Sequence, residues 1–429
     1  MNVLTIDCGT SYLKMAILDE KGQIVNDLSE KCNSLTDKLA TINKFIKQVA
    51  KSGYKDVTVA ISTEMHGFIL VNINGEELTD YYSWTYTCKD STIKELDSKV
   101  KTDWIKNTGM KLKPGIASTS MYDVVNRDNI KLSSAVFLTL GDYIIYKITG
   151  IFPHIHPTYA AASGLYSLET KDWNYKYIEC LGFSDVQFLP IAENEIINCE
   201  INGCCFHFCE AVGDQQAALL GANITPKALS INMGTGSQIS VISEELMLSD
   251  VYQTRPFFSG KYLLTIPHIP CGRALAVIYG LFGDLLIKYT GEESIDENKL
   301  WSILMNSCEK KDYNGDDVNA LSIDMSFFDN AVSNSNRGNI NNIGEDNFKI
   351  SNLSKAIRDC MSENYNKMAQ SLPVNMRAME RIIFTGGVAR KNSMLREAIA
   401  EKIGIGEVDV VEDETIVGLR KWAEESMIK

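Results

Sequence analysis

Two segments of the chain repeat one arrangement of residues that could bind phosphate. Residues 4–17 read LTIDCGTSYLKMAI and residues 229–242 read LSINMGTGSQISVI. In both, an apolar run ends at a polar residue, a Gly-Thr pair follows, and a second apolar run begins. A hairpin tip of this kind presents successive backbone N–H groups and hydroxyls to an anion. Either hairpin alone is typical of an ordinary turn, but the duplication favours two loops that bind a polyphosphate from both sides.

Asp7 stands close before the first Gly-Thr pair, and Asn232 holds the matching position in the second segment. A carboxylate that faces phosphate oxygens directly is repelled by them. We therefore expect Asp7 to hold Mg²⁺, either directly or through water, because this cation takes carboxylate oxygens as ligands. Asn232 adds no charge at the equivalent place.

The chain is long enough for two hydrophobic cores. Its 429 residues exceed the size at which one core stops growing, so two domains of roughly 200 residues are expected. The net charge of −13 argues against nucleic acid and against an anionic membrane surface as partners. The first residues carry no cationic segment and no run of about 18 apolar residues occurs, so we expect neither a signal peptide nor a membrane span. The predicted location is the cytoplasm.

Eleven cysteines are scattered along the chain, and most are expected to be small buried side chains in a reducing compartment. The segment CCFHFC at residues 204–209 concentrates soft metal ligands, namely Cys204, Cys205, His207 and Cys209. Their spacing matches no C-x2-C pair, and the alternation of the segment is typical of a strand. We therefore predict a strand here rather than a metal site.

Hydrophobic periodicity predicts mixed strands and helices in both halves of the chain. The first half begins with an antiparallel meander of strands at 2–7, 12–18 and 23–27, followed by a helix at 35–52 and a buried strand at 57–62. The second half repeats this plan with strands at 229–233, 237–243 and 381–385 and helices near 273–290, 353–372 and 392–402. The duplicated order predicts two α/β domains that face each other.

Five segments occur along the chain in the same order as in the FGGY family of carbohydrate kinases, part of the actin/Hsp70/sugar-kinase superfamily, and resemble its motifs. IDCGTSYLK and INMGTGSQ are similar to its two phosphate loops, and STEMHGFIL at 62–70 is similar to its sugar-contacting segment. VGDQQAALLGA at 212–222 resembles the segment of the catalytic aspartate, and FTGGVARKNSMLREAI at 384–399 resembles the adenosine-binding loop and helix. The resemblance is closest to the sedoheptulokinase-like and xylulokinase-like members.

The resemblance implies a fold and a division of roles between two domains. The implied fold is α/β, with two duplicated ribonuclease-H-like domains of the actin-like ATPase kind and a cleft between them. Residues 1–209 would form the N-terminal domain, with the sugar side and the first phosphate loop. Residues 210–429 would form the C-terminal domain, with the catalytic base, the second phosphate loop and the adenosine site.

The implied activity is transfer of the γ-phosphate of ATP to a hydroxyl of a sugar, with a ketose such as sedoheptulose or xylulose as the expected acceptor. ATP and Mg²⁺ are the implied cofactors. The implied partner is the small-molecule sugar, bound by a monomer or a homodimer. Such a transfer needs aligned reactants, neutralised charge and a base for the acceptor hydroxyl.

The resemblance assigns these roles to individual residues. Asp214 would act as the base and Asp7 as a second catalytic residue and the metal ligand; as an alternative, Asp214 is the N-cap of a helix. The residues expected to bind the nucleotide are Gly9, Thr10, Ser11, Lys14, Gly234, Thr235, Gly236, Gly386, Gly387 and Asn392. The residues expected to face the sugar are Glu64, Met65, His66, Trp84, Asp214 and Gln215.

Purely structural roles stay open for some of these residues. Lys14 could be a solvated strand residue, Trp84 could pack in a core, and a lone histidine such as His66 is often structural. Asn392 could cap the helix that it opens, with Gly386 in the preceding strand-to-helix turn. The sequence pattern alone does not separate these roles from ligand binding.

The acceptor side departs from the family pattern. Tyr86 and Cys88 stand where the family has Asp and Arg after its Trp, and Glu64 replaces a Gln. Because a buried polar site recognises hydroxyls by hydrogen bonds, such changes alter which sugar fits. The sugar is therefore left open. One hypothesis is a less hydroxylated acceptor in a neutral pocket with Tyr81, Tyr82, Tyr86 and Tyr159.

Two other functions are compatible with the resemblance. A catalytically impaired sugar- or nucleotide-binding regulator would keep the fold and lose its acceptor chemistry through Tyr86 and Cys88. An ATPase of the chaperone or actin kind would need neither the EMHG segment nor the segment of Asp214. Since the phosphate-side residues match the family pattern, the kinase is favoured over both.

Overall fold

The computed structural model describes residues 1–32, 34–100, 103–306, 320–333 and 335–428. Contacts divide the chain into two compact units. The first unit contains Met1–Asn223, Ser243–Leu263 and Asp413–Lys429, and the second contains Ile224–Ile242 and Leu264–Glu412. This packing differs from the predicted halves 1–209 and 210–429, because three later segments join the first unit. The predicted halves remain a proposal for the limits of the two family domains.

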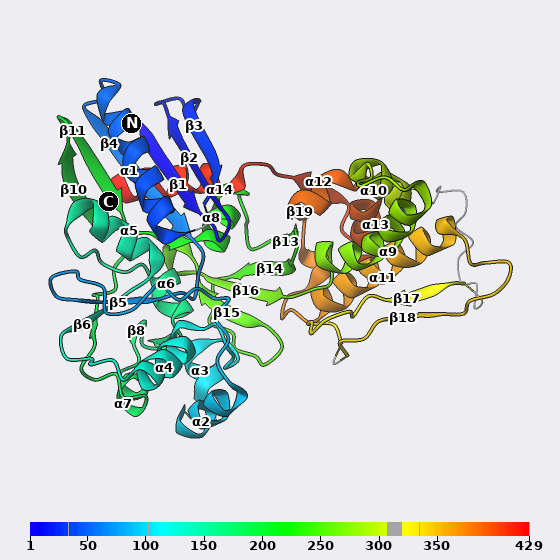
Figure 1. The fold of residues 1–429 in the computed structure, drawn as a ribbon, viewed down its shortest axis with the longest axis horizontal. Coiled ribbons are helices and arrows are strands. Elements are labelled where there is room, and N and C mark those ends of the chain that lie inside the picture. The colour runs from blue at the N-terminus through cyan, green and yellow to red at the C-terminus, as the bar shows by residue number, and fades with distance from the viewer. Residues whose placement is uncertain (33, 101–102, 307–319, 334, 429) are drawn as a thin grey trace. The chain divides into compact units, whose positions relative to one another are not determined.

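The main sheet of the first unit has the strand order β10-β11-β4-β1-β2-β3 (Figure 1). Strand β1 pairs antiparallel with β2 and parallel with β4, and β2 pairs antiparallel with β3, which confirms the predicted meander. The short strand β12 (Val212–Gly213) extends the sheet beside the end of β4. The bounds are Val3–Cys8 for β1, Tyr12–Leu18 for β2, Ile24–Lys31 for β3, Asp56–Thr63 for β4, Ile196–Ile201 for β10 and Cys204–Cys209 for β11.

Helix α1 (Leu35–Lys51) covers one face of this sheet. It begins where Ser34 accepts a hydrogen bond from the Asp37 N–H, as its sequence signal predicts. Its apolar residues, including Ile42 and Ile46, join the cluster that contains Leu4 of β1. Alternation along β1 places Asp7 on the other face, away from α1.

Helices α8 (Asp214–Gly221) and α14 (Glu414–Ile428) pack against each other, and α14 also packs on β1 and β4. Two glycines allow this close approach. A Cβ at Gly221 would collide with the Glu414 carbonyl oxygen, and a Cβ at Gly418 would collide with the Ala217 carbonyl oxygen. This packing explains why the C-terminal helix belongs to the first unit rather than to the second.

The remaining elements of the first unit surround the smaller sheet β5-β6-β9 and the hairpin β7-β8. The remaining strands of the first unit are β5 (Ile69–Asn72), β6 (Ala135–Leu138), β7 (Tyr166–Ser167), β8 (Asp172–Trp173), β9 (Gln187–Phe188) and β15 (Gln253–Pro256). Its other helices are α2 (Asp90–Val100), α3 (Trp104–Thr108), α4 (Ala117–Asp128), α5 (Leu140–Thr149), α6 (Pro157–Ala162) and α7 (Tyr175–Cys180).

The second unit repeats the strand arrangement of the first. Strand β13 pairs antiparallel with β14 and parallel with β19, as β1 does with β2 and β4. Strand β20 follows β19 in parallel, and β16 lies beyond β14. The strand bounds are Ala228–Met233 for β13, Ser237–Ser243 for β14, Tyr262–Pro267 for β16, Ser322–Asp324 for β17, Asn339–Asn341 for β18, Arg381–Thr385 for β19 and Glu407–Val410 for β20.

Five helices accompany this sheet, and three of them match the predicted ranges closely. They are α9 (Gly272–Thr290), α10 (Glu297–Asn306), α11 (Ile350–Gln370), α12 (Gly387–Lys391) and α13 (Ser393–Ile403), counted over the described part of the second unit. Helix α11 packs against α13, and α12 against β13 and β19. The two units therefore share the topology that the duplicated sequence predicts.

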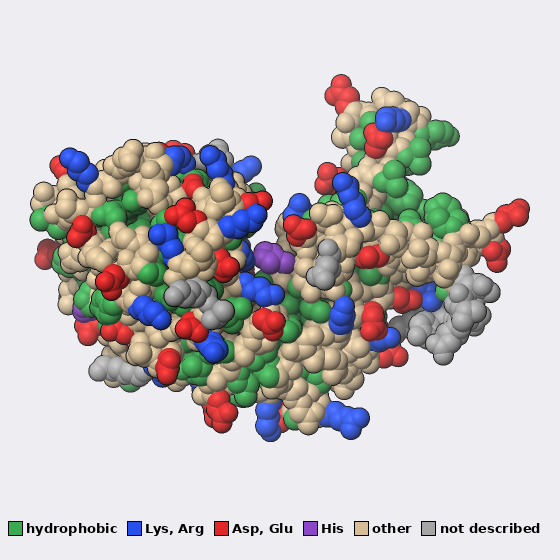
Figure 2. Space-filling model, turned by 90° about the horizontal axis from the view of Figure 1, so that it is seen from below, with side chains coloured by type: hydrophobic (Ala, Val, Ile, Leu, Met, Phe, Trp, Pro, Cys, Tyr) green, Lys and Arg blue, Asp and Glu red, His purple; other side chains and the backbone are tan. Residues whose placement is uncertain are grey.

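The described cysteines are all free, and six of them are buried. Cys308 lies outside the described residues. No helix in the described ranges combines the length and apolar character of a membrane span. On the face drawn in Figure 2, acidic and basic side chains are interspersed.

The contact between α8 and α14 leads to a stability prediction. Gly418→Ala should destabilise the protein by about 1–3 kcal/mol, because the steric conflict with the Ala217 backbone outweighs the higher helix propensity of alanine. Gly280→Ala is the matched control, since Gly280 is an exposed residue of α9 with open space around its Cβ position. The control should be stabilised by up to about 1 kcal/mol. Chemical denaturation measures both, and equal responses would contradict the packing.

Candidate active site

Asp7 lies where β1 meets two neighbouring strands. The register places it opposite Lys14 of β2 and beside Ser62 of β4. The Ser62 hydroxyl donates a hydrogen bond of 3.0 Å to Asp7 Oδ1. Burial raises the pKa of Asp7, and the Ser62 hydrogen bond and the positive charge of Lys14 oppose this rise. The carboxylate is thus held in a fixed position at the end of the strand, beside the first Gly-Thr turn.

The first turn is anchored by Lys38 of α1, a residue that the sequence analysis missed. Its ammonium group donates to the carbonyl oxygens of Gly9, at 2.8 Å, and Thr10, at 3.2 Å. The side chain is buried although it is charged. The sequence does contain a sign that Lys38 is buried, because it falls on the apolar stripe of the helix, three residues after Leu35.

Glu64, which follows β4, connects the turn with the expected sugar side. Thr10 Oγ1 donates to Glu64 Oε2, and the Tyr81 hydroxyl donates to Oε1 at 2.8 Å. Trp84 Nε1 in turn donates to Thr10 Oγ1 at 3.1 Å. Thr10, Glu64, Tyr81 and Lys38 border a pocket of about 400 Å³. The structure thus brings together two residues expected to face the sugar, Glu64 and Trp84, and one expected to bind phosphate.

Asp214 is the first residue of α8 and is not its N-cap, because Gly213 holds that position. Its Oδ1 accepts a hydrogen bond of 2.7 Å from the Gln215 N–H. Burial raises the pKa of Asp214 to about 7, the negative charges of Asp7 and Glu64 add to the rise, and the Gln215 N–H and Arg255 oppose it. Three carboxylates from separate segments therefore act on one another in this unit.

Arg255 of β15 adds a buried positive charge that the sequence analysis did not identify. Its Nη2 donates to Gln253 Oε1 at 2.6 Å and contacts His66 Nε2 at 2.9 Å. Since a guanidinium only donates, His66 carries its proton on Nδ1 and donates to the Ala162 carbonyl at 2.7 Å. Burial lowers the pKa of Arg255 to about 10, and Asp214 opposes this decrease.

Lys113 is a second basic group near Arg255. Burial lowers the pKa of Lys113 to about 8, and the charge of Arg255 contributes to the decrease. No local motif marks either residue, because each comes from a segment far along the chain from Asp7 and Glu64. Arg255 offsets part of the negative charge at Asp214.

Met65 and Gln215 lie on either side of the start of α8. Met65 is buried, and its sulfur lies so close to Gly213 that a Cβ there would be 2.7 Å from it. Gln215 is half-buried and supplies the N–H that Asp214 accepts. Thr10, Ser11 and Lys14 are exposed, as residues that meet a ligand must be.

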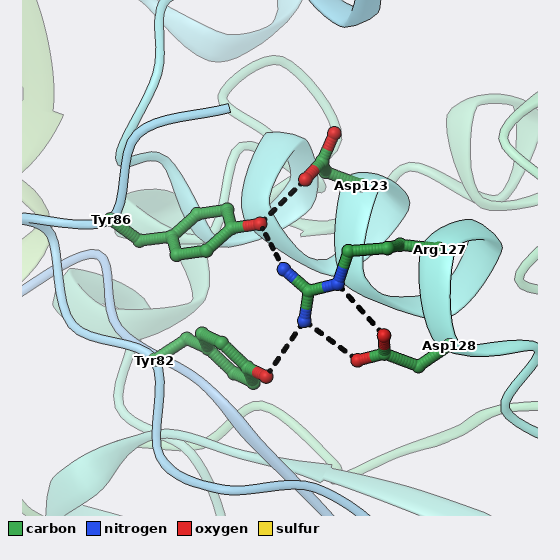
Figure 3. A network of polar contacts seen from close by, with 5 residues as sticks. All are labelled: Tyr82, Tyr86, Asp123, Arg127 and Asp128. Carbon is green, nitrogen blue, oxygen red and sulfur yellow. Dashed lines mark hydrogen bonds and ion pairs between the residues drawn. The ribbon is translucent and has the colours of Figure 1, made fainter. Parts of the chain in front are cut away.

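Tyr86, which replaces the family's Asp, takes part in a charged network (Figure 3). Its hydroxyl donates to Asp123 Oδ2 at 2.5 Å and accepts from Arg127 Nη1 at 2.9 Å. Arg127 Nη2 also donates to the Tyr82 hydroxyl at 3.1 Å and to Asp128. The Tyr86 hydroxyl is therefore hydrogen-bonded to two side chains of α4, Asp123 and Arg127.

The four tyrosines of the aromatic-pocket hypothesis have different surroundings. Tyr159 is fully buried, and its hydroxyl contacts Thr63. Tyr82 and Tyr86 meet Arg127, whereas Tyr81 alone borders the pocket beside Glu64. Cys88 is buried as well. Of the four tyrosines, Tyr81 is the one that borders the pocket beside Glu64, and an acceptor pocket lined by all four stays a hypothesis.

The second Gly-Thr turn is fixed by backbone hydrogen bonds within the second unit. The Gly234 N–H donates to the Gly236 carbonyl at 3.0 Å, and the N–H groups of Gly272 and Arg273 donate to the carbonyls of Gly234 and Thr235. Asn232 Nδ2 donates to Thr385 Oγ1 of β19 at 2.9 Å. This pair occupies the same place in the topology as Asp7 and Ser62.

The expected adenosine segment begins beside this turn. Gly386 has a φ of 90°, and a Cβ there would be 2.5 Å from the Met233 carbonyl oxygen, so the position requires glycine. Gly387 begins α12. Asn392 caps α13, since its Oδ1 accepts from the Leu395 N–H at 3.0 Å. Contact of these residues with adenosine stays a prediction.

The buried ammonium of Lys38 leads to a second prediction. Lys38→Met should lower the free energy of unfolding by about 1–3 kcal/mol, because the Gly9 and Thr10 carbonyls lose a charged donor. Lys44→Met, on an exposed position of the same helix, is the control and should stay within about 0.5 kcal/mol of the wild type. Urea denaturation measures both. A Lys38 variant as stable as the control would show that the anchor is dispensable.

Comparison with known proteins places the chain in a family. The model of the FGGY family of carbohydrate kinases, N-terminal domain, matches residues 2–221, just over half of the chain. A glycerol kinase from Marinomonas sp. (strain MWYL1) is 23% identical over 266 residues, which cover 54% of this chain and 53% of the relative. A xylulose kinase from Bacillus subtilis (strain 168) is 23% identical over 210 residues, 45% of this chain and 42% of the relative.

The chain spans about half the length of the curated relatives it matches. Solved structures extend the likeness of the fold to nearly the whole chain. A ligand-bound xylulose kinase from Lactobacillus acidophilus superposes with a TM-score of 0.82 at 17% identity, over 99% of this chain and 89% of that one. A Plasmodium falciparum glycerol kinase with ADP gives a TM-score of 0.79 at 18% identity, with the same coverage.

These structural matches confirm the predicted fold class, an α/β fold with two duplicated domains of the actin-like ATPase kind. The duplicated strand topology of the two units agrees with it. The matched residues 2–221 include both Asp7 and Asp214. The chain belongs to the FGGY family of carbohydrate kinases.

Proposed function

We propose that the chain is an ATP-dependent carbohydrate kinase that transfers the γ-phosphate of ATP to a hydroxyl of a sugar. Family membership supports the reaction class. The observation that carries the proposal is the grouping of Asp214, whose pKa is about 7, with Asp7 at the first Gly-Thr turn. This grouping supports the proposal because the proposed base for the acceptor hydroxyl would lie next to the loop expected to bind the transferred phosphate.

Asp214 is the proposed general base. A carboxyl group with a pKa near 7 accepts a proton more readily than an ordinary aspartate, and still ionises at neutral pH. Its position at the start of a helix and its bond to the Gln215 N–H fix the direction in which it accepts that proton. Lys14, with the hydroxyls of Thr10 and Ser11, would offset the charge that develops on the phosphoryl group.

Asp7 is the proposed ligand of Mg²⁺. The fit rests on the donor set, because Asp7, Glu64 and Asp214 raise the negative charge of a partly buried region and a hard divalent cation takes oxygen ligands. The Ser62 hydrogen bond holds one oxygen of Asp7 in place. Bound there, Mg²⁺ would neutralise charge on the phosphates of ATP.

The second unit is proposed to bind the nucleotide. Gly234, Thr235 and Gly236 offer backbone groups for phosphate oxygens, and Gly386 and Gly387 leave room for a close approach to the backbone. Asn392 caps the helix through its Oδ1, and its Nδ2, which contacts the Met305 sulfur at 3.0 Å, would be the group that turns to the adenine edge. These roles follow the family resemblance.

The acceptor is proposed to be a small sugar or sugar alcohol, with xylulose or sedoheptulose as first candidates. Glu64 and Tyr81 offer oxygen atoms beside the pocket at Thr10, and Trp84, whose Nε1 donates to Thr10 Oγ1, would offer its ring. His66 would act on the sugar only indirectly, because its Nε2 accepts a hydrogen bond from Arg255 and its Nδ1 donates to the Ala162 carbonyl. Relatives that phosphorylate glycerol, rhamnulose or xylulose define the panel to be tried.

One observation favours a second candidate, a sugar- or nucleotide-binding regulator without kinase activity. Tyr86 stands in place of an acidic family residue, and its hydroxyl is hydrogen-bonded to Asp123 and Arg127. The acceptor site thus lacks one charged group of the family pattern. Sugar-dependent release of ADP separates the two candidates, since a regulator would bind without turnover.

The proposed function predicts sugar-dependent ADP release in a coupled assay with xylulose, sedoheptulose, rhamnulose, glycerol and gluconate. With the best acceptor, Asp214→Asn should lower kcat by at least about 100-fold, because the base is lost, while the Kd for ATP stays within a few-fold. Asp97→Asn, on an exposed position of α2, is the control and should keep full activity. No turnover with any acceptor would favour the regulator. An Asp214→Asn variant that keeps wild-type kcat would show that Asp214 is not the base.

The pKa of Asp214 predicts the pH dependence of the same reaction. The carboxyl must be ionised to accept a proton, so kcat/KM should increase as pH rises through about 7 and level off above it. Glu64→Gln removes a negative charge that raises this pKa, and the midpoint should move to lower pH. The Asp97→Asn control should keep the wild-type midpoint. A pH profile that is flat between 5 and 9 would contradict the assignment.

A further inference from the structure

Three side chains that commonly bind transition metals meet on the main sheet of the first unit, outside the candidate active site. They are Asp56, at the start of β4, and Cys205 and His207 of β11. Their ligand atoms, one from each residue, lie within 4.8 Å of one another. None of the three takes part in the proposed kinase reaction.

The strand register creates this cluster. Strands β4 and β11 are parallel, with Cys205 beside Asp56 and His207 beside Thr58. Alternation along β11 directs Cys205 and His207 to one face of the sheet, and Cys204 and Phe206 to the other. The segment CCFHFC is thus the strand that its pattern predicts, and the third candidate ligand comes from a strand that no spacing within the segment can reveal.

His207 is oriented as metal-binding histidines are. Its Nδ1 lies 2.6 Å from Asn198 Oδ1 on the neighbouring strand β10, and its Nε2 lies 3.5 Å from Asp56 Oδ1. Because the amide oxygen of Asn198 only accepts, the Nδ1 carries the proton, and in the neutral ring Nε2 presents a lone pair toward Asp56 and Cys205. Such an outer hydrogen bond fixes the ring and its tautomer in metal sites.

The donor set selects the class of ion. A thiolate, an imidazole and a carboxylate suit Zn²⁺ and related divalent transition metals, rather than Mg²⁺ or Ca²⁺. Tetrahedral zinc with ordinary bond lengths separates its ligand atoms by roughly 3.3–3.6 Å, so only small side-chain rotations are needed. Asp56 is exposed and His207 has 20% of its side chain accessible, which leaves an entry path and a fourth position for water.

We propose that Asp56, Cys205 and His207 form a binding site for a divalent transition metal of the Zn²⁺ class. The site is separate from the Mg²⁺ ligand of the proposed reaction, because Ser62, the partner of Asp7, is about 20 Å further along β4 at about 3.3 Å per residue. A bound ion would cross-link β4 to β11 at this end of the sheet.

The same geometry would also suit a simple ion pair between protonated His207 and Asp56, so the experiment must detect a metal–sulfur bond. The full chain, freed of metal with a chelator and kept reduced without thiols, is titrated with Co²⁺ alone. We expect one Co²⁺ per chain, a thiolate-to-cobalt charge-transfer band, and displacement of the band by Zn²⁺. These signals do not depend on kinase activity.

Variants assign the signals to residues. Cys205→Ser should remove the charge-transfer band. His207→Gln should weaken Co²⁺ binding at least about tenfold relative to the wild type, and Asn198→Ala should weaken it about 10–100-fold. Cys180→Ser, a half-buried cysteine of α7, is the matched control and should bind as the wild type does. Circular dichroism checks that each variant is folded. No charge-transfer band at stoichiometric Co²⁺, or a band that survives in folded Cys205→Ser, would overturn the proposal.

Discussion

Both units depend on one interaction, the hydrogen bond that joins the polar end of a central strand to a hydroxyl on its parallel neighbour. In the first unit Ser62 donates to Asp7, and in the second Asn232 donates to Thr385. Each bond fixes the strand end from which a Gly-Thr turn begins, so the backbone groups of the turn keep their direction. The exchange of aspartate for asparagine gives only the first unit a charge at this place, which is why the proposed metal ligand belongs to it.

The negative charge of Asp7 must be offset by positive charges nearby, because other carboxylates lie in the same region. Three carboxylates act on one another in a partly buried region, and burial alone would favour their protonated forms. Lys14 and Arg255 lower this cost, while Lys38 is used differently, since it binds only the carbonyls of the turn. The balance leaves the pKa of Asp214 at about 7, which suits its proposed role as a base.

The sequence predicts the strands and helices closely because their apolar periodicity is strong. It singles out Asp7 and Asp214 because Asp7 lies near the end of the buried strand β1 and Asp214 directly follows β12, each in a recognisable segment. Arg255 and Lys113 could not be predicted in this way, since only the folded chain brings Arg255 near Asp214 and Lys113 near Arg255. The same reason applies to Asp56, which meets His207 through strand pairing. The limits of the units could not be predicted either, because a glycine contact between two distant helices, through Gly418, decides where the last segment packs.

The position of α14 has a consequence for how the protein is made. This helix packs on β1 and β4, two of the first four strands to leave the ribosome, yet it is synthesised after the last residue of the second unit. Until α14 is synthesised, the first sheet exposes the apolar surface that this helix later covers. The second unit, Ile224–Ile242 and Leu264–Glu412, is made before α14 and is itself interrupted by Ser243–Leu263 of the first unit. Nascent chains halted before residue 413 should accordingly depend on chaperones more than the finished protein does.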